Sequence, residues 1–241
     1  MRKLRRLIKK LIRFFPIALT KNEYYDRLTK KVLQSICSPE SICIDAGAHS
    51  GKILRMMIDA APNAMHYAFE PIPDYFTYLK KAYKNFAKVY CIALSNKTET
   101  TTFNIVLSNM AYSGLQRRVL NKKQEDILIF VETDLLDNII PKEEKITLLK
   151  IDVEGAELLV LQGAEKTIQQ SKPIILFEFG KEGASIYDYD SIKMFAYITE
   201  TLHYEIFTLK DWLKKQSPLS ADQFADYYQN GKEYFFLAAP R

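Results

Sequence analysis

One acidic residue and two glycines are spaced in a way that could support ligand binding. Asp45 ends a short apolar run, and Gly47 and Gly51 follow it, so the pattern D-x-G-x-x-x-G leads into an amphipathic segment. Glycines let backbone N–H groups approach a ligand, and the N-terminus of a following helix adds a partial positive charge. The pattern therefore predicts the first half of a nucleotide-binding βαβ unit.

The spacing of the glycines distinguishes between the classes of ligand that such a turn could bind. A dinucleotide fingerprint would need glycines where this chain has His49 and Lys52. A phosphate-binding P-loop would need a glycine in place of Ala46 and a hydroxyl in place of Ile53. The remaining pattern suits a ligand that carries an ammonium group and no pyrophosphate, such as S-adenosylmethionine.

A second pattern, D-x-E-G, follows an apolar run at residues 146–151. In an extended chain the side chains of Asp152 and Glu154 point to the same side, so both carboxylates could converge on one ligand. We expect a general base there, or as an alternative a Mg²⁺ site that lowers the pKa of a hydroxyl, and we assign no metal ligand. In another interpretation one carboxylate pairs with Lys150 or caps the helix expected to begin at Ala156.

The remaining elements are those of an α/β fold that would position these residues. Short apolar runs predict strands at 42–44, 66–70, 89–94, 146–151, 173–179, 204–209 and 234–238. Amphipathic periodicity predicts helices at 23–36, 53–58, 74–86, 157–161, 164–168 and 192–202. Segments 101–107 and 127–131 predict an extra β-excursion, and the polar loop 108–126 between them could form part of a lid.

Glu70 closes the second predicted strand, 19 residues after Gly51. This is where nucleotide-binding α/β folds place a carboxylate that accepts both ribose hydroxyls. The alternative is a surface acid at a strand end.

Composition limits the class of protein. The chain has 241 residues, 48% of them apolar and 26% charged, which is ordinary for one globular domain. The net charge of +5 comes from residues 1–13, which hold seven Lys or Arg and no acid. The rest carries 27 basic and 29 acidic residues, so no nucleic-acid-binding surface is expected. Three cysteines at unrelated spacings indicate a reducing compartment.

The N-terminal segment is basic and amphipathic. Six apolar residues between Leu4 and Phe15 share one face of a predicted helix, and the basic residues fill the other. Its charges exclude a membrane span, and the short apolar run after it argues against a signal peptide. Residues 2–15 could lie on an anionic membrane surface, or they could pack on the domain. We therefore divide the chain into an N-terminal helical extension, 1–40, and a domain at 41–241.

Three motifs together resemble the FkbM family of class I methyltransferases. They are I-D-A-G-A-H-S-G from residue 44, F-E-P from residue 69 and K-I-D-V-E-G-A-E from residue 150. The resemblance covers about residues 41–180, and His49 stands where the family generally has Asn. It implies a Rossmann-like, mostly parallel seven-stranded sheet with an antiparallel last strand and helices on both faces.

The resemblance also implies S-adenosylmethionine as the cofactor and methylation of a hydroxyl. The expected cofactor-binding residues are Asp45, Gly47, Ala48, His49, Ser50 and Gly51 at the methionine end, Glu70 and Pro71 at the ribose, and Ala93 and Leu94 at the adenine. Asp152 and Glu154 are the expected catalytic residues.

We expect O-methylation of a glycan or another small metabolite, by a cytoplasmic protein that could contact the inner membrane surface. The alternative is a protein that keeps the fold and binds cofactor or membrane without turnover. The sequence does not indicate an oligomeric state.

Overall fold

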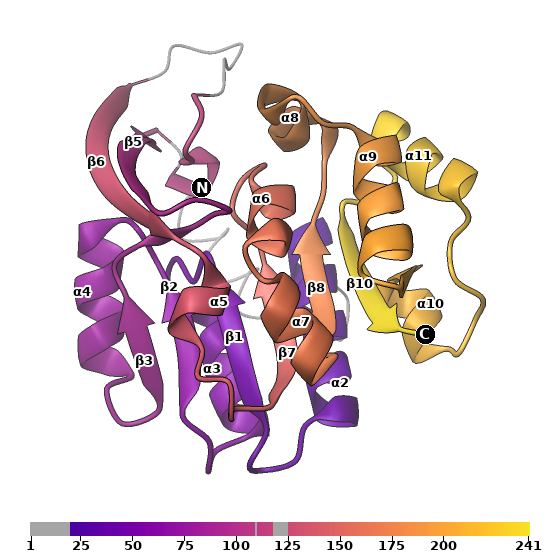
Figure 1. Cartoon of the computed structure of the whole chain (residues 1–241), viewed down its shortest axis with the longest axis horizontal. Helices are drawn as coiled ribbons and strands as arrows, with labels where there is room; N and C mark the ends of the chain where they lie inside the picture. The colour runs from indigo at the N-terminus through magenta and orange to yellow at the C-terminus, as the bar shows by residue number, and fades with distance from the viewer. Residues whose placement is uncertain (1–19, 109, 118–124) are drawn as a thin grey trace, which may run out of the picture.

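A seven-stranded sheet forms the centre of the computed structural model (Figure 1), which describes residues 20–108, 110–117 and 125–241. Its strand order is β3-β2-β1-β7-β8-β10-β9. The strands are β1 (Ile42–Ala46), β2 (His66–Phe69), β3 (Ala87–Tyr90), β7 (Ile146–Ile151), β8 (Ile174–Glu178), β9 (Tyr204–Thr208) and β10 (Phe235–Pro240). The first five are mutually parallel, and β10 runs antiparallel to both β8 and β9. This confirms the predicted Rossmann-like fold.

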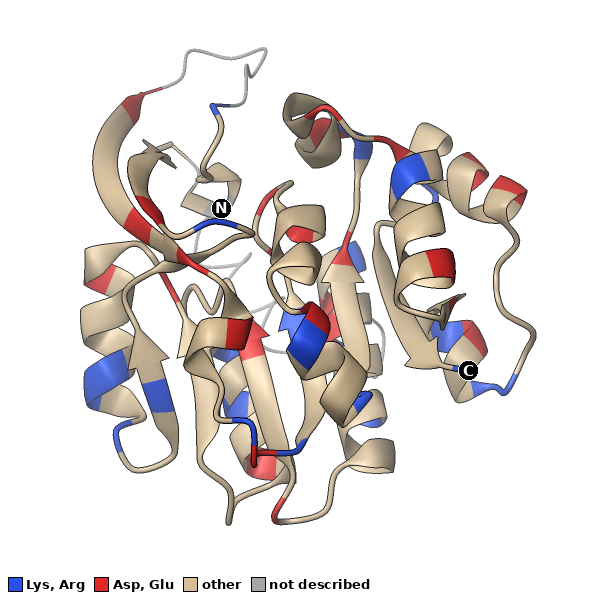
Figure 2. Ribbon diagram, viewed as in Figure 1, with Lys and Arg blue, Asp and Glu red and all other residues tan. Residues whose placement is uncertain are grey.

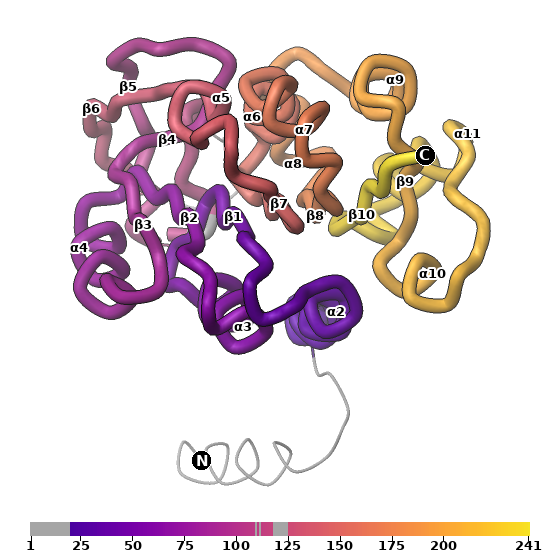
Figure 3. Tube along the Cα trace, turned by 60° about the horizontal axis from the view of Figure 1, so that its bottom comes forward, coloured from indigo at the N-terminus to yellow at the C-terminus, as the bar shows by residue number. Residues whose placement is uncertain are grey.

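Alternate residues of the central strands enter two separate cores. Cys43, Leu148 and Leu176 pack on one face with α2 (Lys21–Ile36), α3 (Lys52–Ala60) and α10 (Leu209–Leu213). The next residue of each of these strands packs on the other face with α6 (Glu157–Gln162), α7 (Glu165–Ser171), α9 (Ser191–Ala196) and α11 (Ala221–Asn230). Figure 3 shows the two helical layers on either side of the sheet. Burial on both faces explains why these strands appear as continuous apolar runs.

The remaining helices are short or lie at the edges of the sheet. They are α4 (Pro73–Ala82), α5 (Leu136–Ile139), α8 (Lys181–Ala184), the single-turn 3₁₀ helices η1 (Met110–Tyr112) and η2 (Ser185–Tyr187), and a π-helical turn η3 (Tyr197–Thr201). The helix predicted at 192–202 is therefore two elements, α9 and η3, with different hydrogen bonding.

One predicted strand is wrong, because residues 89–94 do not form a single element. β3 ends at Tyr90, the chain bends, and β4 (Ala93–Leu94) joins a second sheet of order β4-β6-β5. Residues 89–92 are partly buried and Ala93 and Leu94 are buried, but all six are apolar or aromatic, so no change in polarity marks the bend. The predicted β-excursion is confirmed as the antiparallel pair β5 (Glu99–Val106) and β6 (Asp126–Asp134).

Two predictions fall wholly or partly outside the described residues. The basic helix at 2–15 lies outside them, as do residues 109 and 118–124 of the predicted lid. Within the described part of the chain, no helix is long and apolar enough to cross a membrane.

Candidate active site

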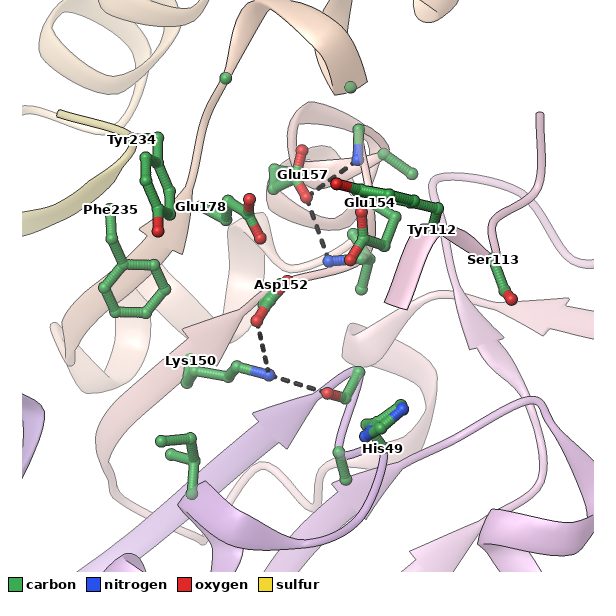
Figure 4. Close-up of a pocket in the computed structure, with 18 of the residues that line it drawn as sticks. His49, Tyr112, Ser113, Lys150, Asp152, Glu154, Glu157, Glu178, Tyr234 and Phe235 are labelled. Atoms are coloured by element: carbon green, nitrogen blue, oxygen red, sulfur yellow. Dashed lines mark hydrogen bonds and ion pairs between the residues drawn. The ribbon is translucent and has the colours of Figure 1, made fainter. Parts of the chain in front are cut away.

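A cavity of about 1160 Å³ opens at the C-terminal ends of β1, β2, β7 and β8. Open α/β sheets bind ligands at this edge. The loop after β1 and the segment 69–72 form one part of its lining, and residues 92–94 and 110–115 cover them. The loop 152–157, the segment 178–185, α2 and the start of β10 form the rest. Figure 4 shows the acidic side chains in the middle of this cavity.

The loop after β1 requires glycine at its first turn. Gly47 has a φ of 77°, and a Cβ there would lie 1.9 Å from the backbone oxygen of Asp152. The N–H groups of Gly47 and Ala48 both donate to the Phe69 carbonyl at 3.0 Å, which ties the loop to β2. The sequence pattern thus folds into a tight loop between two strand ends.

Lys150 holds this loop from the neighbouring strand. Its Nζ lies 3.0 Å from Asp45 Oδ1 and 3.6 Å from Asp152 Oδ2, and it donates to the Gly47 carbonyl at 2.8 Å. Burial alone would lower the pKa of Lys150, but the adjacent Asp45 and Asp152 carboxylates raise it above its usual value. The ammonium group therefore stays charged and cross-links β1, β7 and the glycine loop.

Glu70 lies at the end of β2 with only 3% of its surface exposed, and it lines the cavity. Its oxygens accept the N–H groups of His49 at 2.7 Å and Ile72 at 2.9 Å. Burial raises the pKa of Glu70 to about 7, although these two hydrogen bonds oppose the shift. Each carboxylate oxygen has a second lone pair, so Glu70 can still accept ligand hydroxyls.

His49 lines the same part of the cavity. Its ring packs against Tyr75 with centroids 4.2 Å apart, and its Nε2 is buried without a hydrogen-bond partner. Burial lowers the pKa of His49, so the ring is neutral at pH 7. A buried, unpaired ring nitrogen at a cavity wall is a group that a ligand can satisfy.

Three carboxylates from two strands meet in the middle of the cavity. Asp152, Glu154 and Glu178 each offer an oxygen, and these oxygens all lie within 4.8 Å of one another. Glu154 and Gly155 have φ values of 59° and 109°, so the extended backbone that we expected here is wrong. The carboxylates converge through a left-handed turn and through the neighbouring strand β8.

Their protonation states differ. Burial and the charge of Asp152 raise the pKa of Glu178 well above its usual value. Burial would raise the pKa of Asp152 as well, but Lys150 and a hydrogen bond from Glu178 lower it below its usual value. A proton on this pair therefore favours Glu178, and Asp152 is the carboxylate that ionises first.

The alternative roles considered for Asp152 and Glu154 were pairing with Lys150 and capping the helix at Ala156. The structure shows the first for Asp152, and Glu157 performs the second. Asp152 does contact Lys150, as the alternative had it. The backbone before α6 is held instead by Glu157, which accepts the N–H groups of Val153 at 3.0 Å and Gly155 at 3.1 Å. The contact with Lys150 leaves Asp152 34% exposed, on the cavity side.

Most of the predicted site residues lie on the cavity wall: Gly47, Ala48, His49, Ser50, Glu70, Pro71, Ala93, Leu94, Asp152 and Glu154. Two do not. Asp45 is fully buried behind the wall against Lys150, and Gly51 begins α3 in a left-handed conformation against Leu79. Asp45 therefore shapes the loop through Lys150.

Sequence reasoning missed three groups of lining residues. Glu178 stands at the end of a predicted strand, so the rule that selected Asp45 and Glu70 could have selected it as well. Lys150 occupies an otherwise apolar strand, which was a signal of a buried charge pair. The lining residues of α2 and of the segment 229–235 gave no local signal.

Comparison with known proteins agrees with this architecture. The model of the methyltransferase FkbM domain matches residues 45–209. No curated protein matched the sequence. Among solved structures, methyltransferase FkbM from Methylobacillus flagellatus KT aligns with a TM-score of 0.52 and 17% identity, covering 84% of this chain. This chain spans 44% of that protein's length, so the likeness concerns the fold alone.

Two further structures align less closely. A putative methyltransferase from Streptococcus mutans, solved with S-adenosylhomocysteine, has a TM-score of 0.48 and 11% identity, covering 88% of this chain and 94% of that one. The plantazolicin methyltransferase BpumL, solved with a pentazolic desmethylPZN analogue and S-adenosylhomocysteine, has a TM-score of 0.47 and 12% identity, covering 98% of this chain and 91% of that one. The family match spans well over half of the chain and includes the glycine loop, Glu70 and the D-x-E-G turn. The chain belongs to the family of proteins that carry the methyltransferase FkbM domain.

Proposed function

We propose that this protein transfers a methyl group from S-adenosylmethionine to a hydroxyl of a glycan or another small metabolite. One observation carries the proposal. A single cavity contains the glycine loop and Glu70 at one end and the Asp152, Glu154 and Glu178 carboxylates in its middle. Cofactor-binding groups and groups able to accept a proton thus face the same space.

The residues at the first end fit this cofactor. Glu70 can accept ribose hydroxyls, and the unpaired Nε2 of His49 and the loop backbone offer polar contacts to the methionine part. The carboxylates of the cavity favour the cationic sulfonium and ammonium groups. When bound, S-adenosylmethionine supplies an already activated methyl group, so the protein need only align the acceptor and remove its proton.

The carboxylate cluster is placed to act on the acceptor. Ionised Asp152 can accept a hydrogen bond from the acceptor hydroxyl and take its proton as the oxygen gains the methyl group. Lys150, which contacts Asp152, holds that carboxylate in place. Three carboxylate oxygens within 4.8 Å would also suit Mg²⁺, which would act by lowering the pKa of the same hydroxyl.

Titration calorimetry with S-adenosylhomocysteine tests the cofactor without knowledge of the acceptor. We expect S-adenosylhomocysteine to bind at one site per chain and S-adenosylmethionine to compete for that site. NAD⁺ and ATP are the matched controls, because the glycine loop departs from both of their fingerprints. Absence of heat with S-adenosylhomocysteine, or equal affinity for NAD⁺, would contradict the proposal.

A further inference from the structure

One face of α2 lines the cavity, and it meets the start of α3 through the ion pair between Asp26 and Lys52. Asn22, Tyr25, Asp26 and Thr29 all lie on the wall, and their spacing of three, four and seven residues places them on a single helical face. Segment 233–235 lies beside them. Figure 4 shows Tyr234 and Phe235 on the far side of the carboxylates from His49 and Tyr112. This part of the wall lies outside residues 45–209, the segment matched by the family model.

The two parts of this wall are fastened to each other. Lys21 Nζ donates to the carbonyls of Gly231 at 2.9 Å and Lys232 at 2.8 Å. The Tyr25 hydroxyl donates to Glu233, and its ring meets that of Tyr234 edge-on with centroids 4.8 Å apart. These contacts join residues more than 200 positions apart in the chain, so this wall forms only in the folded protein.

Thr29 provides an independent sign of a ligand. Its residue surface is 1% exposed, and its Oγ1 has no hydrogen-bond partner although it lines the cavity. A threonine within a helix commonly bonds the carbonyl four residues earlier, as Thr199 does with Phe195 at 2.9 Å. A buried hydroxyl left unpaired destabilises the protein unless a ligand or an ordered water satisfies it.

The charges on the wall indicate which ligand fits. The described lining residues include no arginine, and each of their three lysines already has a partner: Asp26 for Lys52, Asp45 for Lys150 and Gln229 for Lys181. Acidic residues outnumber these lysines on the wall, and Figure 2 shows them at the end of β8 and in the loop before α6. No lysine or arginine of the described wall is therefore without a partner, so a phosphate or carboxylate on the acceptor would meet mainly like charge.

We propose that the face of α2 together with segment 233–235 binds the methyl acceptor, and that this acceptor is an uncharged, polyhydroxylated ring such as a hexosyl unit. This inference rests on the proposed function. Lys21 Nζ lies over one face of the Tyr234 ring, 5.6 Å from its centroid, and the opposite face can pack on the carbon side of such a ring. The Thr29 hydroxyl and the Glu178 carboxylate can bond its hydroxyls, with no cation required.

Binding in the presence of saturating S-adenosylhomocysteine tests the assignment. The probes are the p-nitrophenyl β-glucoside, β-galactoside and α-mannoside, followed by saturation-transfer NMR and calorimetry. The matched control probe is p-nitrophenyl β-glucuronide, which replaces the CH₂OH of the glucoside by a carboxylate. We expect at least one neutral hexoside to bind and the glucuronide to bind at least about tenfold more weakly, because like charges meet on this wall.

Two variants locate the site. Thr29→Val preserves shape and should weaken hexoside binding about fivefold, the effect of one hydrogen bond. Tyr234→Ala should weaken it about tenfold. Both should retain the affinity for S-adenosylhomocysteine. Thr199→Val, the same change at a buried helical position whose hydroxyl already donates to the Phe195 carbonyl, should alter neither.

Each outcome is decisive. If Thr29 is only structural, Thr29→Val stabilises the protein by removing an unpaired hydroxyl and leaves hexoside binding unchanged. If S-adenosylhomocysteine binds but no hexoside does, or if the glucuronide binds as well as the glucoside, the acceptor site is wrongly assigned. If S-adenosylhomocysteine itself does not bind, the proposed function fails first.

Discussion

Lys150 Nζ lies 3.0 Å from Asp45 Oδ1, and the two side chains are 3% and 0% exposed. The Asp45 carboxylate has no access to water, so its charge depends on the Lys150 ammonium. Breaking a buried ion pair by removing one partner typically destabilises a protein by about 3–5 kcal/mol, whereas replacing both partners can be nearly neutral. The pair connects the central strands of the sheet and supports the glycine loop.

We predict that Lys150→Met lowers the free energy of unfolding by about 3–5 kcal/mol, and that Asp45→Asn combined with Lys150→Met recovers most of the loss. Urea unfolding measures both. The surface pair Arg55–Asp59, 2.9 Å apart and more than half exposed, is the control: Arg55→Met should cost less than about 1 kcal/mol. Equal costs at the two positions would contradict this account.

We predict that Glu70→Gln weakens S-adenosylhomocysteine binding by at least about tenfold at pH 8, because an ionised acceptor is worth about 1.5–3 kcal/mol per hydrogen bond. Burial raises the pKa of Glu70 to about 7, so protonation below that pH should weaken binding by the wild type. Affinity should therefore fall from pH 8 to pH 6 in the wild type and stay flatter in the variant. Glu99→Gln, at an exposed strand position, is the control.

The same raised pKa has the opposite effect on the unliganded fold. The folded state binds the Glu70 proton more tightly than the unfolded chain does, so this group lowers stability as pH rises from about 4.5 towards 7. Relative to the wild type, Glu70→Gln should gain stability across that interval. A constant difference in unfolding free energy from pH 4.5 to 8 would show that Glu70 is not buried as described.

We predict that Asp152→Asn and Glu154→Gln keep the affinity for S-adenosylhomocysteine and lose turnover. Loss of a general base typically costs about 10²–10⁴-fold in rate. The assay follows radioactive methyl transfer from S-adenosylmethionine to whichever neutral hexoside binds. Wild-type rates in both variants would make the two carboxylates structural.

The same assay separates a base from a metal site. If the carboxylate cluster acts as a base, chelator leaves the wild-type rate unchanged. If the cluster holds Mg²⁺, chelator abolishes methyl transfer and added Mg²⁺ restores it. Glu178→Gln further distinguishes the base role from the metal role, because the substitution removes a metal ligand only if the cluster holds Mg²⁺.

We predict that residues 2–15, which lie outside the described residues, bind anionic lipid surfaces. Seven cations on a predicted amphipathic helix should give affinity for vesicles rich in phosphatidylserine that declines with salt. Deleting residues 2–15 should abolish sedimentation with these vesicles and leave S-adenosylhomocysteine affinity unchanged. Vesicles of phosphatidylcholine are the control. If the full-length protein never sediments with anionic vesicles, packing on the domain is the better interpretation.

The parallel core of the fold was predictable from the sequence because strands buried on both faces are continuous apolar runs. The bend at residues 91–92 was hidden because the end of β3 and the whole of β4, which belong to different sheets, form one uninterrupted apolar run. The cofactor side of the cavity was predictable for a related reason. Acids at the ends of parallel strands meet at one edge, and Glu70 and Asp152 both do so.

The other side of the cavity could not be predicted from local patterns. Thr29 and Tyr25 belong to a helix whose apolar periodicity indicates only that it packs on the sheet. The helix is fastened at this wall by contacts of Lys21 and Tyr25 with segment 231–234, more than 200 residues away. Such contacts depend on the strand order of the finished sheet, which the sequence does not display.

The position of β10 has a consequence for biosynthesis. β10 lies between β8 and β9, yet it is made after both of them. Until it inserts, the nascent chain presents two unpaired strand edges, which invite pairing with other chains. Premature termination before Phe235 would therefore do more than shorten the protein. It would leave an open slot in the sheet, and we expect such products to be aggregation-prone and to be removed by cellular quality control.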